Sequence, residues 1–174
     1  KKNVAFAIHK APHLSLLNFD VAVKIAINLK EKYEDDFVVV VHDSRPEFDL
    51  DFAKRLVAKV SELIGGSVIP VKVFSTVEEC LQFYSETRII VSSRMHPLII
   101  GCLAGSACLP LKGSSKVDEF ARLAGLTVAE PKEISADTDI ESYAKVVDAG
   151  KLDDLHKCSL TLFDGFSSGD EGSA

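Results

Sequence analysis

The sequence has no tryptophan, a single methionine and only four cysteines. The cysteines show neither the CxxC spacing nor the paired histidines of a zinc site, so no metal is expected. Three of them sit in apolar helix or strand patterns, where a free thiol behaves as a small hydrophobic side chain. We therefore expect buried thiols in a reducing compartment.

Long apolar runs and basic clusters are also missing. No stretch approaches the roughly 18 apolar residues of a membrane helix. The start, KKNVAFAIH, is too short for a signal peptide and reads as a first strand, so a cytoplasmic location, at most peripheral to a membrane, is expected. The formal net charge of -6 without a Lys/Arg block argues against nucleic acid as a partner, but it allows a small cationic pocket.

Several ligand-binding motifs are absent. The loop after the first apolar run contains no glycine, so a GxGxxG dinucleotide fingerprint is excluded there. GxxxxGK[ST] and GxSxG do not occur, which disfavours a P-loop or a nucleophile elbow. No cofactor is expected.

The 174 residues alternate between apolar strand-like runs and amphipathic helical segments. Such alternation predicts βαβ units, and thus a Rossmann-like three-layer α/β/α domain with a mostly parallel sheet of about six strands. One domain over 1–165 and a flexible acidic Gly/Ser tail over 166–174 are expected. The predicted strands are 3–8, 37–42, 68–74, 88–93, 107–111 and 127–130. The predicted helices are 19–34, 48–64, 76–86, 96–105, 116–125, 137–150 and 152–163.

Polar residues follow the predicted strands, where open α/β sheets bind their ligands. Together these residues form a rim at the strand ends. The rim is rich in cations although the chain is acidic, which indicates a small anionic ligand. Its members are His9, Lys10, His13, His42, Asp43, Ser44, Arg45, Ser75, Ser92, Ser93, Arg94, His96, Lys112, Ser114, Ser115 and Lys116.

The sharpest candidate is SSRMHP, residues 92–97, where a strand meets an apolar helix. Helix N-terminal amides and the Arg94 guanidinium suit a phosphate or carboxylate, and His96 could transfer a proton. The alternative is that Arg94 pairs with an acidic neighbour and His96 caps the helix. Lys116 stands at another helix start, where a nearby anion would account for a cation that the helix dipole disfavours.

Two further groups are weaker candidates. His42 and Asp43 follow a strand and could line the pocket. Asp49 and Asp51 fall at a predicted helix start, where stabilisation by the helix dipole is the simpler explanation.

Residues 88–126, RIIVSSRMHPLIIGCLAGSACLPLKGSSKVDEFARLAGL, resemble the C-terminal signature of the polysaccharide pyruvyl transferase family. Arg94-Met95-His96, Ala104-Gly105 and Lys116-Val117 fall on the family's positions. The sequence departs from the signature at three places: Ala107 replaces a proline, Gly113 a tyrosine, and Ser114-Ser115 an Asp-Pro pair.

The resemblance implies the C-terminal half of a glycosyltransferase-B-like enzyme that transfers pyruvyl from phosphoenolpyruvate to a sugar as a ketal. By position, Arg94 would bind the donor phosphate or carboxylate, His96 would act as general acid, and Lys116 would neutralise donor charge. The implied partners are phosphoenolpyruvate, a saccharide acceptor of a polysaccharide or cell-surface glycan, and an N-terminal half-domain. The wider predicted substrate site includes His9, His42, Ser92, Ser93, Ser114 and Ser115.

Two other functions stay open. The same rim could hold the diphosphate of a nucleotide sugar in a glycosyltransferase-B half-domain, with Glu130 as the acidic residue available for a ribose. The chain could also be a non-catalytic module whose site has decayed, which the replaced tyrosine favours.

Overall fold

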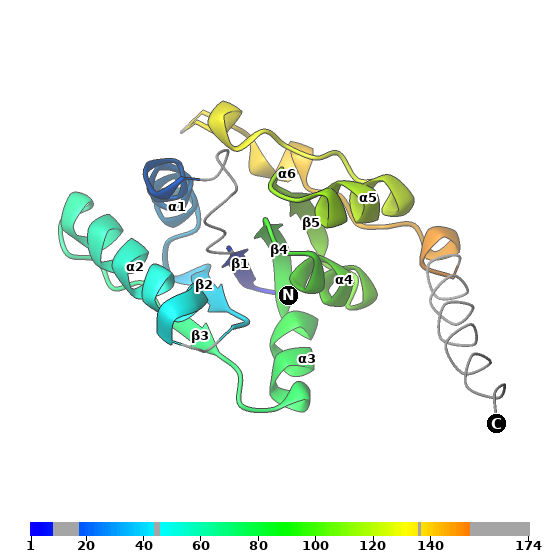
Figure 1. Ribbon diagram of the computed structural model, residues 1–174, viewed down its shortest axis with the longest axis horizontal. Helices are drawn as coiled ribbons and strands as arrows, with labels where there is room; N and C mark the ends of the chain where they lie inside the picture. Colours follow the sequence, from blue (N-terminus) through cyan, green and yellow to red (C-terminus); the bar gives the residue numbers. More distant parts are fainter. Residues whose placement is uncertain (9–17, 44–45, 136, 154–174) are drawn as a thin grey trace, which may run out of the picture.

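The computed structural model describes residues 1–8, 18–43, 46–135 and 137–153. In these residues five strands form one parallel sheet in the order β3-β2-β1-β4-β5 (Figure 1). The strands are β1 (Asn3–Ala7), β2 (Phe37–Val41), β3 (Val71–Val73), β4 (Thr87–Ser92) and β5 (Ala107–Pro110). Pro70 immediately precedes the edge strand β3, a position that suits proline because it has no N–H to donate to a sheet.

Helices cover both faces of the sheet, which confirms the predicted three-layer Rossmann-like class (Figure 1). α1 (Phe19–Tyr33) and α2 (Asp51–Leu63) pack on one face with Val4, Phe6 and Val39. The other face carries α3 (Val77–Ser85), α4 (Met95–Leu103) and α5 (Ser115–Ala124), packed on Ala5, Ala7 and Val40. The two cores take alternate residues of each strand because side chains of a strand point to opposite faces in turn.

Helix ends follow the polar signals of the sequence. The Asn18 side chain accepts a hydrogen bond from Val21 N at 2.9 Å and caps α1. Thr76 caps α3 by accepting from Glu79 N at 3.1 Å, and the Glu79 carboxylate accepts from Ser75 N at 2.9 Å. These bonds differ from a capping box only in that Glu79 accepts from the amide before the N-cap residue Thr76 rather than from that of Thr76 itself. Each cap satisfies an amide that the helix itself leaves unpaired.

Two predicted elements near the C-terminus are wrong. Residues 127–130 form no strand in the sheet but a single bridge between Leu111 and Ala129, so five strands are described instead of about six. The predicted helix 137–150 shrinks to α6 (Ile140–Tyr143), after which Lys145 pairs with Cys108 of β5 through two backbone hydrogen bonds of 2.8 and 3.1 Å. Pairing with the open sheet edge wins over local helix propensity.

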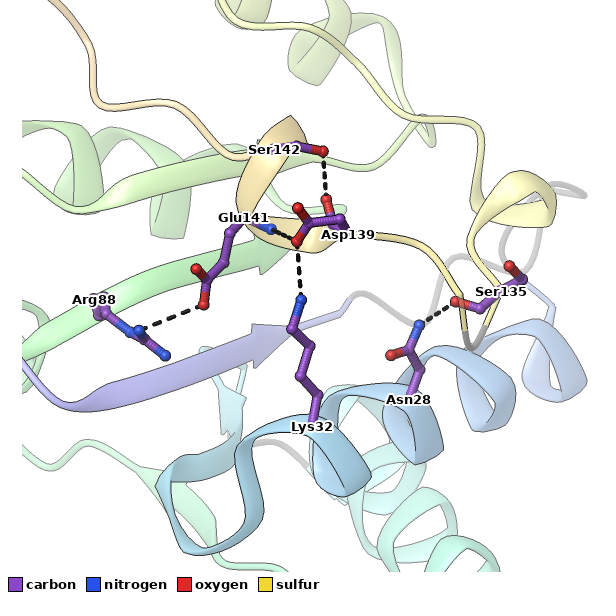
Figure 2. A network of polar contacts seen from close by, with 7 residues as sticks. All are labelled: Asn28, Lys32, Arg88, Ser135, Asp139, Glu141 and Ser142. Carbon is purple, nitrogen blue, oxygen red and sulfur yellow. Dashed lines mark hydrogen bonds and ion pairs between the residues drawn. The ribbon is translucent and has the colours of Figure 1, made fainter.

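Residues 131–135 and 137–147 form an edge strap that first lies over α1 and then returns beside β5 (Figure 1). Figure 2 shows three polar contacts that hold it. Lys32 Nζ lies 2.9 Å from the Asp139 carboxylate, Arg88 lies 3.4 Å from Glu141, and the Asn28 amide donates to the Ser135 carbonyl. Buried Ile140 and Ala144 add apolar contacts to the face that carries α1.

Of the last predicted helix, 152–163, the structure describes only the beginning, where residues 149–153 are helical. The expected domain end at 165 and the tail 166–174 lie outside the described residues. The described cysteines, Cys80, Cys102 and Cys108, are buried free thiols, as expected. No helix among the described residues combines the length and the apolar character needed to span a bilayer.

Candidate functional site

The candidate residues lie where the parallel strands end, because every strand presents its carboxyl end to the same edge of the sheet. His42 directly follows β2, Ser93 and Arg94 follow β4, and the residues before α5 follow β5. β4 and β5 are neighbours, so the helices that follow them begin at adjacent strand ends.

Ser92 ends β4 and Ser93 follows it before α4, and both are buried. The Ser92 hydroxyl donates to the Ala7 carbonyl at 2.8 Å and accepts from Arg94 N at 2.9 Å. Ser93 N also donates to Ala7 O, at 3.2 Å. These bonds tie the start of α4 to the central strand β1, so Ser92 positions the site rather than offering its hydroxyl to solvent.

Arg94 forms an ion pair with Asp49, with Nη2 2.5 Å from the carboxylate oxygen. The exposed fractions of the two side chains are 16% and 2%, so Asp49 is buried and Arg94 is largely shielded from water. The sequence alternative that Arg94 has an acidic neighbour is therefore correct. The interpretation of Asp49 as a helix-dipole residue alone is incomplete, because Asp49 lies in the short turn η2 (Pro46–Leu50) and meets an arginine 45 positions along the chain.

His96 is exposed and occupies the first turn of α4. Arg94, not His96, stands at the N-cap, and its side chain makes no capping hydrogen bond. The first amides of α4 therefore resemble the helix N-termini that bind anions. Gly101 sets the position of this helix, because a Cβ there would lie 2.0 Å from Ile90 Cδ1 of β4.

His42 lies between the start of α4 and a pocket at the ends of β2 and β3, and it lines that pocket. Its Nε2 lies 2.7 Å from the Tyr84 hydroxyl, and its ring stacks on Tyr84 with centroids 5.8 Å apart. Burial lowers the pKa of His42 to about 4, and the charges of Arg94 and His96 add to this effect. His42 thus lies within electrostatic reach of both Arg94 and His96, and it is neutral at pH 7.

The pocket beside His42 has a volume of about 330 Å³. It opens between the ends of β2 and β3 and the start of α3, and both apolar and polar side chains form its walls. Its lining residues are Val41, His42, Val73, Phe74, Ser75, Thr76, Val77 and Cys80. The sequence predicted His42 and Ser75 here, but it missed Phe74 and the buried Tyr84 behind His42, because an aromatic residue within an apolar strand or helix pattern carries the same signal as any core position.

The start of α5 contributes the remaining candidates. The Ser114 hydroxyl accepts from Val117 N at 3.4 Å and caps the helix, while Ser115 and Lys116 are exposed in its first turn. Lys112 lies 2.6 Å from Glu130, and this contact raises the pKa of the lysine. Glu130, the carboxylate considered for a ribose, is therefore engaged by a neighbouring cation.

Five rim residues, His9, Lys10, His13, Ser44 and Arg45, lie outside the described residues. Within the described ranges, no three His, Cys, Asp or Glu side chains gather in a way that could hold a metal ion.

No protein-family model matches the sequence, and no curated protein matches it. The resemblance to polysaccharide pyruvyl transferases is thus not confirmed. Solved structures do match the fold. UDP-GlcNAc 2-epimerase from Methanocaldococcus jannaschii has a TM-score of 0.54 at 13% identity, over 93% of this chain and 46% of that chain. Its structure in complex with UDP-GlcNAc and UDP has a TM-score of 0.52 at 14% identity, over 92% and 45%.

The S. aureus MnaA–UDP co-structure matches with a TM-score of 0.50 at 13% identity, over 74% of this chain and 32% of that chain. The present chain thus spans less than half the length of each of these structures. At these identities the likeness concerns the fold: a Rossmann-like α/β domain of the kind that forms one half of a glycosyltransferase-B enzyme.

Proposed function

We propose that this chain is the nucleotide-sugar-binding half-domain of a carbohydrate-processing enzyme with glycosyltransferase-B architecture. The observation that carries the proposal is the position of His42. This residue lines a pocket with aromatic and aliphatic walls as well as polar groups, and it also lies within the electrostatic field of Arg94 and His96. A nucleoside diphosphate has matching parts, a flat base and a diphosphate joined by a ribose.

The diphosphate would bind at the starts of α4 and α5. Their first turns carry exposed His96 and Lys116 at adjacent strand ends. Helix N-terminal amides and cations stabilise phosphate oxygens. The Arg94 guanidinium, which Asp49 holds in a fixed position, would be available to a phosphate oxygen at the start of α4.

The base would enter the pocket between β2 and β3. Phe74 and His42 supply flat surfaces, and the volume of about 330 Å³ lies in the range of small-molecule pockets. The matched structures support this choice of ligand, since S. aureus MnaA is in a co-structure with UDP and the M. jannaschii epimerase is in complex with UDP-GlcNAc and UDP.

Pyruvyl transfer from phosphoenolpyruvate is the second candidate. It is favoured by the Arg94-Met95-His96 sequence at the start of α4 together with Lys116 in the first turn of α5. Both candidates place an anion at the same two helix starts, but only the nucleotide uses the pocket beside His42. An N-terminal half-domain and an acceptor saccharide belong to either version.

Calorimetric titration with UDP and with phosphoenolpyruvate tests the proposal. We expect saturable UDP binding that is tighter than phosphoenolpyruvate binding. Lys116→Ala should weaken UDP binding by about tenfold to a hundredfold, the effect of about 1.5–3 kcal/mol for a hydrogen bond to a charged group.

Lys2→Ala is the matched control. Lys2 is an exposed lysine just before β1, at the amino ends of the strands and away from the proposed site, and it pairs with Asp36. It should leave UDP binding unchanged. Tighter binding of phosphoenolpyruvate, lost in Lys116→Ala, would replace the proposal by pyruvyl transfer. Failure of both ligands to bind would indicate a non-catalytic module.

A further inference from the structure

Tyr84 is a fully buried residue of α3 that lies behind His42 and does not line the pocket itself. Its ring packs among Phe74, Phe83 and His42, with centroid separations of 6.0, 5.4 and 5.8 Å. Its hydroxyl lies 2.7 Å from His42 Nε2, the usual length of a hydrogen bond that an O–H group makes.

The direction of this hydrogen bond follows from the surroundings of the phenol. Among the described residues, His42 Nε2 is the hydrogen-bond partner that the Tyr84 hydroxyl has. If Nε2 carried a hydrogen and donated it, the hydroxyl hydrogen of Tyr84 would be buried without an acceptor. Leaving a buried donor unsatisfied costs about 1–3 kcal/mol, so the hydroxyl donates and Nε2 accepts.

The second ring nitrogen then has only one possible state. Burial and the nearby charges of Arg94 and His96 keep the imidazole uncharged at neutral pH, with a pKa of about 4. A neutral imidazole carries one hydrogen, and since Nε2 accepts, that hydrogen is on Nδ1.

We propose that Tyr84 is a positioning residue that holds His42 in the Nδ1–H tautomer, so that His42 presents one N–H donor to an acceptor oxygen of the ligand. The inference rests on the proposed function for the identity of that ligand, a nucleoside diphosphate in the pocket that His42 lines. A fixed donor favours a carbonyl or phosphate oxygen and disfavours an N–H group at the same place.

Nitrogen NMR of the free protein tests the tautomer without any ligand. Long-range ¹H–¹⁵N correlation spectra distinguish a ring nitrogen that carries hydrogen from one that does not. His42 is assigned by the signals that disappear in His42→Gln among those of the five histidines. We expect hydrogen on Nδ1 in the wild type and a shift of the population towards the Nε2–H form in Tyr84→Phe. Wild-type His42 with hydrogen on Nε2, or spectra that Tyr84→Phe leaves unchanged, would overturn the inference.

Tyr33→Phe is the matched control. Tyr33 is also a buried tyrosine, at the end of α1, and its hydroxyl has no hydrogen-bond partner among the described residues. Removing that hydroxyl should leave the His42 signals in place. If Tyr84→Phe does not fold, the wild-type tautomer alone decides.

UDP titration separates this inference from the proposed function. Tyr84→Phe should weaken UDP binding about tenfold, the loss of about one hydrogen bond, although Tyr84 does not contact the ligand. An Nδ1–H tautomer in a protein that does not bind UDP would keep the inference about Tyr84 and His42 but reject the ligand. UDP binding by a protein whose His42 carries hydrogen on Nε2 would keep the ligand but reject the inference about Tyr84 and His42.

Discussion

Two arginines at the opposite ends of β4 form ion pairs of different kinds. Arg88, near the start of the strand, lies 3.4 Å from Glu141 of the edge strap, and the two side chains are 45% and 49% exposed (Figure 2). Arg94, after the end of the strand, lies 2.5 Å from Asp49, and this pair is 16% and 2% exposed. One pair lies on the surface, and the other is part of the interior.

The difference shows what each arginine can contribute. A surface pair adds little stability because water screens both charges. A buried pair has lost its hydration, so neither partner can be removed without leaving a charge in a poorly solvated place. Arg94 is therefore a structural residue as well as a candidate ligand residue, and its substitution does not report on binding alone.

Replacing each arginine by alanine is the most direct way to break the comparison. Arg94→Ala should lower the free energy of unfolding by about 3–5 kcal/mol, because buried Asp49 loses its cationic partner. Arg88→Ala should cost about 0–1 kcal/mol. Urea denaturation followed by circular dichroism measures both values.

Arg94→Ala/Asp49→Ala serves as the control, since it removes both charges. It should be more stable than the sum of the two single substitutions predicts. Equal costs for Arg94→Ala and Arg88→Ala would show that the Asp49 pair is as solvated as the Glu141 pair.

The pH dependence of stability gives the next largest effect. It arises from His42, which follows β2 at the same ends of the strands as Arg94. The pKa of His42 is about 4 in the folded protein and 6.5 without the effects of folding. Between these values the unfolded state binds more protons, so the free energy of unfolding rises with pH from about 4 to about 6.5 and is flat above. The change attributable to His42 is about 3 kcal/mol.

His42→Gln should remove this part of the slope, while His96→Gln, a change at an exposed histidine, should keep most of it, because burial is the largest cause of the low pKa of His42. Urea denaturation at several pH values between about 4.5 and 7.5 compares the three proteins. The same slope in His42→Gln and wild type would mean that His42 is hydrated when folded. Exposed Asp139, whose pKa is lowered by its bond to Lys32, responds at lower pH.

Most of the fold was predictable from the sequence because strand and helix periodicities differ and both were strong. The run FVVVV predicts a strand buried on both faces, and β2 is such a strand. Gly125 closes α5 in a left-handed conformation with φ of 68°, as its position after the apolar pattern predicts. The strap was mispredicted because its conformation depends on β5, which residues 137–150 do not reveal locally.

The site was predictable in its location and less so in its contacts. Strand order places polar residues after β2, β4 and β5 at one edge, and this follows from topology alone. Asp49 and Tyr84, by contrast, meet Arg94 and His42 across 45 and 42 positions of sequence. Such partners have no spacing rule, so a single sequence contains no signal that pairs them.

Replacing Lys32 should give the smallest effect, and it tests the exposed ion pairs of the comparison. Its pKa is raised by its contact with Asp139, one of the three contacts that hold the edge strap (Figure 2). Lys32→Ala should speed amide exchange at Lys145 N, which pairs with Cys108 O, by less than about fivefold. The amides of β1 should keep their rates, because the strap opens locally.

At about 1 M salt the difference between variant and wild type should disappear, since added ions screen an exposed pair. Faster exchange in β1 as well would mean that the strap and the sheet open together, and that this exposed pair belongs to the same cooperative unit as the buried one.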